Sequence, residues 1–151
     1  SGVLNEVGSH ILDLSNYLFD LKNHKIISSK TQSVISDVDD IVHLELLSNH
    51  KKYNFNFNWV NKNIRKPSFS FKLKLKDNTE VFFDQQKIEL SKNNQIFKNL
   101  SVVDLASKVP FYLRGIDFTN QMLDLINDCI VMTNVEEALL VNKIIKDTKI
   151  L

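Results

Sequence analysis

Alternation of apolar and polar residues constrains the fold of this chain more than any other feature. In residues 52–61 every second side chain is aromatic, at Tyr53, Phe55, Phe57 and Trp59. Residues 68–76 repeat the period with Phe69, Phe71, Leu73 and Leu75. A period of two indicates strands with one buried and one polar face. Short turn-forming segments separate these strands, so we predict that neighbouring strands are antiparallel.

Further strands are predicted at residues 25–33, 40–47, 80–84 and 87–90. The second half of the chain is predicted to be helical. It contains a short helix in Asn99–Val109 before Pro110, a helix over Arg114–Cys129, and a last helix opened by a capping box of Asn134 and Glu137. One face of the last helix is predicted to consist of Val135, Ala138, Leu139, Asn142 and Ile145. These elements predict one α+β domain over residues 1–151, with a largely antiparallel, open-faced sheet of about five or six strands and helices on one face.

The aromatic ladder of residues 53–59 has three interpretations. Base stacking in nucleic-acid binding requires interleaved basic residues, but Asn54, Asn56 and Asn58 stand there instead. A sugar platform is the second interpretation, and a sheet face packed on helices or on a partner is the third and favoured one. The net charge of +1 provides no general attraction for nucleic acid or anionic membrane, so we expect neither as a partner.

Three residue types limit the metal and redox chemistry. The only cysteine, Cys129, allows no intramolecular disulfide, which fits a reducing, cytoplasmic location, and its place on an apolar stripe predicts a buried thiol. The acids Asp37, Asp39 and Asp40 could ligate calcium, but without an EF-hand pattern a turn or solvated loop is favoured. The four histidines lack the spacing of a zinc site, so no metal is expected.

Residues 2–20 carry two stripes of helical spacing. The apolar stripe consists of Leu4, Val7, Ile11, Leu14 and Leu18, and the polar stripe of Glu6, His10, Asp13 and Tyr17. A carboxylate four residues before a histidine lies one turn away and can orient the imidazole, although such a pair is more often a solvated contact. Gly8 between them costs about 1 kcal/mol relative to alanine in a helix, which indicates close approach by a neighbour.

The segment from Gly2 through Glu6, Gly8 and His10 to Asp13 resembles the G-x-L-x-D-x-G-x-H-x-x-D signature of the C-terminal domain of the Gfo/Idh/MocA oxidoreductase family. The resemblance implies that His10 is the acid/base for a sugar or polyol hydroxyl and that Glu6 is its acidic partner. Glu6 departs from the aspartate usual at that position. Asp13 would then hydrogen-bond the substrate or complete the local network.

The same resemblance implies NAD or NADP as cofactor, but the chain has only Gly2, Gly8 and Gly115, from which no dinucleotide fingerprint can be built. We therefore expect the chain to be the substrate-binding and oligomerisation portion of a longer two-domain enzyme, without the Rossmann domain. Alone it should be inactive and bind no cofactor. The alternative is a non-catalytic scaffold or protein-interaction module that uses the open sheet face. In either case we expect a homodimer through that face.

Overall fold

The computed structural model describes residues 2–61, 68–84, 87–101, 123, 126, 127 and 135–150. These residues fall into two compact units. Unit 1 comprises Ser1–Lys62 and Thr133–Leu151, and unit 2 comprises Asn63–Met132. Each unit is described by itself below.

Unit 1 begins with a helix that contains two kinds of turn. A π-helical turn, η1, spans Leu4–Gly8, and the α-helix α1 follows directly as Ser9–Phe19. We call residues 4–19 the signature helix. The helix ends at Asp20, which adopts a left-handed conformation with φ 54°, while the buried Asn16 accepts the Leu21 N–H on its side-chain oxygen at 3.0 Å. The predicted helix over residues 2–20 is confirmed, and the π turn is a feature that the spacing did not indicate.

The sheet of unit 1 has three antiparallel strands, β1 (Lys25–Gln32), β2 (Ile41–Ser48) and β3 (Lys51–Asn58), in that order. Cross-strand pairs place apolar side chains opposite one another, at Val42–Phe57, Leu44–Phe55 and Leu46–Tyr53. Asn49 and His50 join β2 to β3 with positive φ values of 50° and 62°, as a two-residue hairpin turn requires. The pairing places one apolar and one polar face on this sheet, as the alternation predicted.

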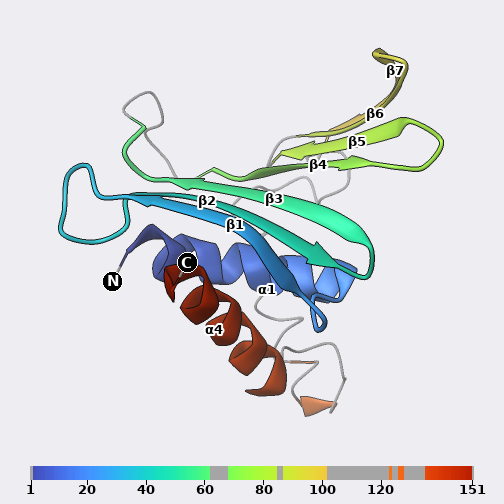
Figure 1. The fold of residues 1–151 in the computed structure, drawn as a ribbon. Coiled ribbons are helices and arrows are strands. Elements are labelled where there is room, and N and C mark those ends of the chain that lie inside the picture. Colours follow the sequence, from blue (N-terminus) through green and yellow to red (C-terminus); the bar gives the residue numbers. More distant parts are fainter. Residues whose placement is uncertain are drawn as a thin grey trace. The chain divides into compact units, whose positions relative to one another are not determined.

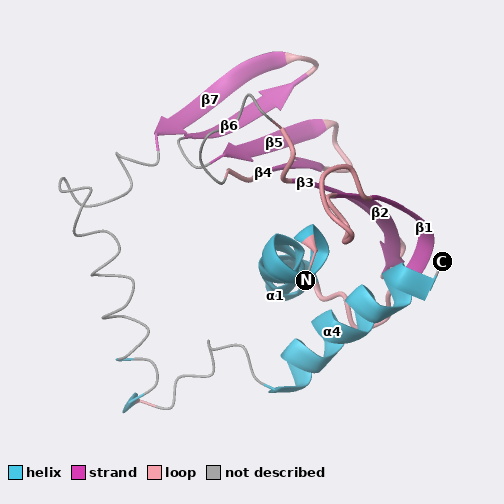
Figure 2. Ribbon diagram, turned by 90° about the vertical axis from the view of Figure 1, so that its left-hand side faces the viewer, coloured by secondary structure: helices cyan, strands magenta, loops and turns pink. Residues whose placement is uncertain are grey.

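The last helix, α4 (Val135–Ile150), lies with α1 on the same face of the three-stranded sheet (Figures 1 and 2). Of the predicted apolar face of α4, Ile145 is buried as expected, but the assignment of the other four residues is wrong. Val135 and Leu139 are 74% and 61% exposed, whereas the buried residues are Val141, Ile144, Ile145 and Thr148. Thr148 also links the helix to the sheet, because its carbonyl accepts the Ser29 hydroxyl of β1 at 2.8 Å.

The core of unit 1 lies between the helices and the sheet. Its buried apolar side chains are Val3, Leu4, Leu12, Leu21, Val42, Leu44, Leu46, Phe57, Val141, Ile144 and Ile145. Tyr53 and Phe55 pack against this cluster, so the first three rungs of the aromatic ladder face the helices. Trp59 differs: it is partly exposed, and its indole N–H donates to Asp40 at 2.8 Å. The structure therefore supports the packing interpretation of the ladder.

Unit 2 contains a four-stranded antiparallel sheet in the order β4 (Ser70–Lys74), β5 (Thr79–Asp84), β6 (Lys87–Lys92) and β7 (Gln95–Ser101). The strand β7 corrects one prediction, since Asn99–Ser101 belong to a strand and not to a helix. The remainder of the predicted helix Asn99–Val109 lies outside the described residues. So do most of the predicted helix Arg114–Cys129, Cys129 itself, and the capping residue Asn134.

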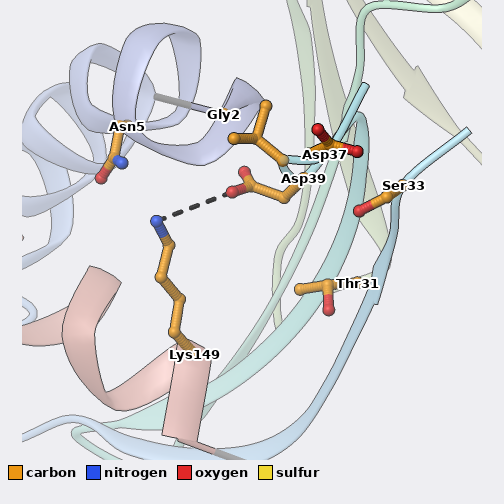
Figure 3. A pocket seen from close by; sticks show the side chains of 8 residues that line it. Gly2, Asn5, Thr31, Ser33, Asp37, Asp39 and Lys149 are labelled. Carbon is orange, nitrogen blue, oxygen red and sulfur yellow. Dashed lines mark ion pairs between the residues drawn. The ribbon is translucent and has the colours of Figure 1, made fainter. Parts of the chain in front are cut away.

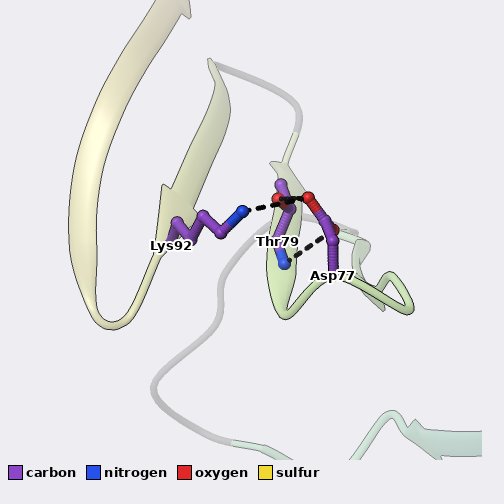
Figure 4. A network of polar contacts seen from close by, with 3 residues as sticks. All are labelled: Asp77, Thr79 and Lys92. Atoms are coloured by element: carbon purple, nitrogen blue, oxygen red, sulfur yellow. Dashed lines mark hydrogen bonds and ion pairs between the residues drawn. The ribbon is translucent and has the colours of Figure 1, made fainter.

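The β4–β5 hairpin closes through a polar network (Figure 4). The Asp77 carboxylate accepts the Thr79 hydroxyl at 2.8 Å and the Thr79 N–H at 3.1 Å, and Lys92 lies 3.2 Å away. These contacts, the Thr79 hydroxyl foremost, lower the pKa of Asp77 to about 2. Asn78 takes a positive φ of 62°, which confirms the predicted turn at Asp77 and Asn78.

The α+β class with antiparallel pairing is confirmed by these elements, whose strands form two hydrogen-bonded sheets of three and four strands. Across the described ranges, no helix combines the length and the apolar character needed to cross a membrane.

Candidate functional site

The predicted site residues all lie on the signature helix. Glu6 is in the π turn and His10 is in the first turn of α1, and both are exposed. Asp13 is half-buried one turn further along. The helix therefore carries the three polar residues on consecutive turns, in the order that the signature gives them.

His10 faces away from the core of unit 1. The buried positions of the helix are Leu4, Gly8, Leu12 and Asn16, at a spacing of four. His10 is two residues from both Gly8 and Leu12, which is about 200° around the helix axis. Its imidazole is therefore presented on the surface opposite the sheet.

The surface around His10 is partly apolar. Val7 and Leu18 are 41% and 46% exposed, and Tyr17 is exposed about two helical turns beyond His10. Of the predicted apolar stripe, only Leu4 is fully buried, while Ile11 packs against the edge of the core. The stripe therefore lies along the flank of the helix, beside the polar stripe, and does not form the centre of the contact with the sheet.

Both glycines of the signature are explained by close approach. A Cβ on Gly8 would lie 3.5 Å from two ring carbons of Phe57 in β3 and 2.9 Å from the buried Leu4 side chain. A Cβ on Gly2 would overlap the Asp39 carboxylate. The absence of side chains at these two positions lets the helix approach β3 at one point and the β1–β2 loop at the other.

The loop between β1 and β2 is folded around a buried aspartate. Asp40 Oδ2 accepts the backbone N–H groups of Val34 and Ile35, each at 2.6 Å, and of Ser36 at 3.1 Å. Its Oδ1 accepts the Ser36 hydroxyl and the Trp59 indole, each at 2.8 Å. The Ile35 amide and the Trp59 indole are the leading causes that hold the pKa of Asp40 far below its ordinary value.

The neighbouring Asp39 reaches the start of the signature helix. Its carboxylate accepts the Leu4 N–H at 2.9 Å, and its backbone carbonyl accepts the Val3 N–H at 2.7 Å. Two of the three clustered acids thus bind backbone amides, as the loop interpretation of this cluster requires. Within the described ranges, no group of three or more histidine, cysteine or acidic side chains is arranged to hold a metal ion.

A shallow hollow of about 310 Å³ opens at this end of the helix (Figure 3). Its polar lining comes from Asn5, Thr31, Ser33, Asp37, Asp39 and Lys149. Lys149, in the last turn of α4, points its ammonium group toward Asp39, with Nζ 3.6 Å from Oδ1. Sequence reasoning missed Asp39 and Lys149 as a pair, because they lie 110 positions apart and neither belongs to a local motif.

One of the other histidines joins two elements of unit 1. His24 is almost fully buried, with Nδ1 3.2 Å from the Leu21 carbonyl oxygen and Nε2 3.8 Å from the Asp147 carboxylate of α4. It therefore has a packing role. His43 and His50 are exposed, on β2 and in the turn that follows it.

Comparison with known proteins gives one informative result. No known protein family and no curated protein matches the sequence. Among solved structures, the fold is similar to that of the WlbA dehydrogenase from Bordetella pertussis, whose crystal structure is a complex with NADH and UDP-GlcNAcA. The TM-score is 0.53 at 14% sequence identity, and the match covers 98% of this chain and 45% of that one. The chain thus spans less than half the length of the structure it matches, and the likeness is one of fold.

Proposed function

We propose that this chain is the substrate-binding and oligomerisation portion of an NAD(P)-dependent oxidoreductase, and that it belongs to the Gfo/Idh/MocA family that its signature resembles. The fold similarity to WlbA over 98% of the chain carries the proposal. That similarity and the signature are independent, because one depends on the arrangement of the backbone and the other on residues within 13 positions of the N-terminus.

In this proposal His10 removes the proton from a sugar or polyol hydroxyl while the hydride is transferred to the nicotinamide. An imidazole suits this role because it exchanges a proton near neutral pH, and a positioned acid/base is worth about 10²–10⁴-fold in rate. The exposed position of His10, away from the core, supports the assignment. Glu6, one turn earlier, would orient the ring, and Asp13 would hydrogen-bond the substrate.

The apolar surface beside His10 supports a site that another surface completes. Val7, Tyr17 and Leu18 expose large apolar groups on the helix that carries the candidate acid/base. Hydride transfer requires a nicotinamide held close to the substrate in a site that excludes water. A dinucleotide-binding domain placed against this face of the helix would supply the nicotinamide and would exclude water from the site.

The same comparison supports our proposal for the substrate class. WlbA was crystallised with UDP-GlcNAcA, a sugar nucleotide. We propose a sugar or polyol, with or without a nucleotide, as the substrate of the longer enzyme.

Turnover by a longer protein that includes an N-terminal dinucleotide-binding domain tests the proposal. We expect NADH or NADPH formation with a member of a panel of sugars, polyols and sugar nucleotides that includes UDP-GlcNAcA. The 151-residue chain alone should show no micromolar binding of NADH or NADPH by calorimetry, because no signature for cradling a pyrophosphate is present in its sequence. A longer protein that forms neither NADH nor NADPH with any member of the panel would contradict the proposal.

The second candidate is an interaction module, and the β4–β7 sheet favours it. Its strand pairing places Phe71, Leu73, Val81, Phe83, Ile88 and Leu90 on one face. The opposite face carries the ion pairs Lys72–Glu80 and Lys87–Glu89. A contiguous apolar face of this kind is typical of an interface.

We propose that the chain forms a symmetric homodimer, with the apolar face of the β4–β7 sheet as the interface, in either functional case. Sedimentation equilibrium at tens of micromolar should give twice the chain mass of 17.5 kDa. A Leu73→Asp variant should lower the dimer population, and Lys72→Asp on the charged face is its control. A single species at 17.5 kDa for the unchanged chain would overturn the dimer.

A further inference from the structure

The π turn that carries Glu6 is held at its leading end by Asp39. The Asp39 carbonyl and carboxylate accept the amides of Val3 and Leu4 at 2.7 and 2.9 Å. These are among the amides that a helix cannot satisfy internally at its start. A carboxylate at this position also interacts favourably with the helix dipole.

The far end of the turn is held by a different part of unit 1. Gly8 abuts the ring of Phe57, which is a buried core residue of β3. Glu6 therefore lies between two anchors, one on the β1–β2 loop and one on the sheet. Neither anchor includes a side chain of the polar stripe itself.

The leading anchor is itself fixed on two sides. Asp40 folds the loop from Val34 to Ser36 through three backbone hydrogen bonds, which places Asp39 directly beside the helix. Lys149 supplies a positive charge 3.6 Å from the Asp39 carboxylate (Figure 3). The Asp39 side chain is only 11% exposed, so this interaction is screened less than a surface pair would be.

The geometry of the turn matters because a π turn changes the register of a helix. One extra residue per turn rotates the residues before the bulge by about 100° relative to those after it. Glu6 lies within the turn and His10 lies after it. The angle between Glu6 and His10 around the helix therefore depends on whether the turn keeps its π geometry.

We infer that Asp39 is a positioning residue: with Lys149 as its counter-charge, it fixes the π turn and thereby the placement of Glu6 relative to His10. The catalytic consequence rests on the proposed function. The structural content rests on the contacts of Asp39, Gly2 and Gly8 alone. Gly2, the leading glycine of the signature, is then required because a side chain there would occupy the place of the Asp39 carboxylate.

NMR on the 151-residue chain tests this inference without any substrate. In Asp39→Ala, exchange of the Leu4 amide should accelerate about tenfold or more, the usual effect of losing a hydrogen bond to a charged group. Residual dipolar couplings should show the N–H vectors of residues 4–8 turning relative to the β1–β3 sheet, and the His10 ring resonances should shift. Asp37→Ala is the matched control, because Asp37 is an exposed acid of the same loop. It should leave all three signals unchanged.

Two further variants separate positioning from loss of folding. Gly2→Ala keeps every hydrogen-bonding group but places a methyl group where the Asp39 carboxylate lies, so it should reproduce the changes seen in Asp39→Ala. Asp39→Asn keeps an amide oxygen that can accept the Leu4 N–H, so it should restore most of the amide protection. Unchanged couplings for residues 4–8 in Asp39→Ala, or in Gly2→Ala if the first variant does not fold, would overturn the inference.

The inference and the proposed function fail separately. Normal turnover by a His10→Ala enzyme would show that His10 is not the acid/base, but it would not affect the dipolar couplings predicted for residues 4–8 in Asp39→Ala. Unchanged couplings in the Asp39 variant would remove the positioning role and leave the effect of His10 on turnover intact.

Discussion

The three-stranded sheet of unit 1 and the four-stranded sheet of unit 2 come from the same kind of sequence but bury their apolar faces differently. In unit 1, β2 places Val42, Leu44 and Leu46 fully inside a core that α1 and α4 complete. In unit 2, the only buried residue within the described ranges is Thr79, which is still 8% exposed, and the apolar residues of β4 and β5 are half-buried.

The difference shows that alternation defines the faces of a strand but not what covers them. Unit 1 can hold a side chain such as His10 in a fixed place because its helix rests on a closed core. The half-buried face of the β4–β7 sheet is better suited to an interface. The candidate catalytic residues lie on the first unit and the candidate dimer surface on the second.

The largest effect should come from truncating matched leucines in the two sheets. Leu44→Ala should lower the free energy of unfolding by about 2–5 kcal/mol, because it leaves a cavity in a closed core. Leu73→Ala in β4 should cost less than about 1.5 kcal/mol when the chain is monomeric, because its side chain is only partly removed from water. Urea unfolding at chain concentrations below the dissociation constant of the dimer measures the free energy of unfolding of both variants. Equal losses in Leu44→Ala and Leu73→Ala would contradict the contrast between the units.

Filling the space beside Gly8 should have the next largest effect. Gly8→Val places methyl groups against Phe57 and the buried Leu4, so we expect a loss of about 1–3 kcal/mol from overpacking. Lys146→Val, at an exposed position of α4, is the control for the lower helix propensity of valine. A Gly8 variant that costs no more than its control would show that the helix does not approach β3 closely.

A smaller change of opposite sign is expected at Tyr53. Its hydroxyl is buried and has no hydrogen-bond partner among the described residues, and burial, with Asp20 as a lesser cause, raises the pKa of this phenol. Tyr53→Phe should stabilise unit 1 by up to about 1 kcal/mol, because it removes an unsatisfied polar group from the core. Tyr17→Phe, at an exposed hydroxyl, should change stability by less than about 0.5 kcal/mol. Destabilisation by Tyr53→Phe would indicate a partner for the hydroxyl.

The smallest effect is an acid dependence of the β4–β5 hairpin in unit 2. Because the pKa of Asp77 is lowered from 3.8 to about 2, its carboxylate stabilises the hairpin above pH 3.8. That contribution is lost as the pH falls through about 2. The protection factor of the Thr79 amide, which is its intrinsic exchange rate at each pH divided by the observed rate, should therefore fall over this range in the unchanged chain and show no such step in Asp77→Asn. A step of equal size in the variant would assign the effect to another group.

Much of the fold was predictable because it depends on local patterns. The strands around Phe55 and Phe71 follow from a period of two, and the turns at Asn49 and Asn78 follow from residues that tolerate positive φ. The strand at Asn99–Ser101 was missed because its pairing with β6, and not its own composition, determines its structure. The buried face of α4 was misassigned because Val135 and Leu139 are apolar but point away from the sheet.

The candidate site was predictable only in part. The signature identified Glu6, His10 and Asp13 and placed them on one helix, as the structure has them. The π turn at Leu4–Gly8 and its anchors Asp39 and Phe57 could not be predicted, because they arise from contacts between segments distant in sequence. The loop that Asp40 folds was indicated only as a cluster of acids.

The kcat of a His10→Ala variant in a longer protein that includes the dinucleotide-binding domain tests the central claim most directly, since the claim is that unit 1 presents His10 as the acid/base. We expect a decrease of about 10²–10⁴-fold with the fold retained, because the side chain is exposed and contributes no core packing. His43→Ala, at an exposed histidine on β2, should leave kcat unchanged. A His10→Ala enzyme with near-normal kcat would contradict the account.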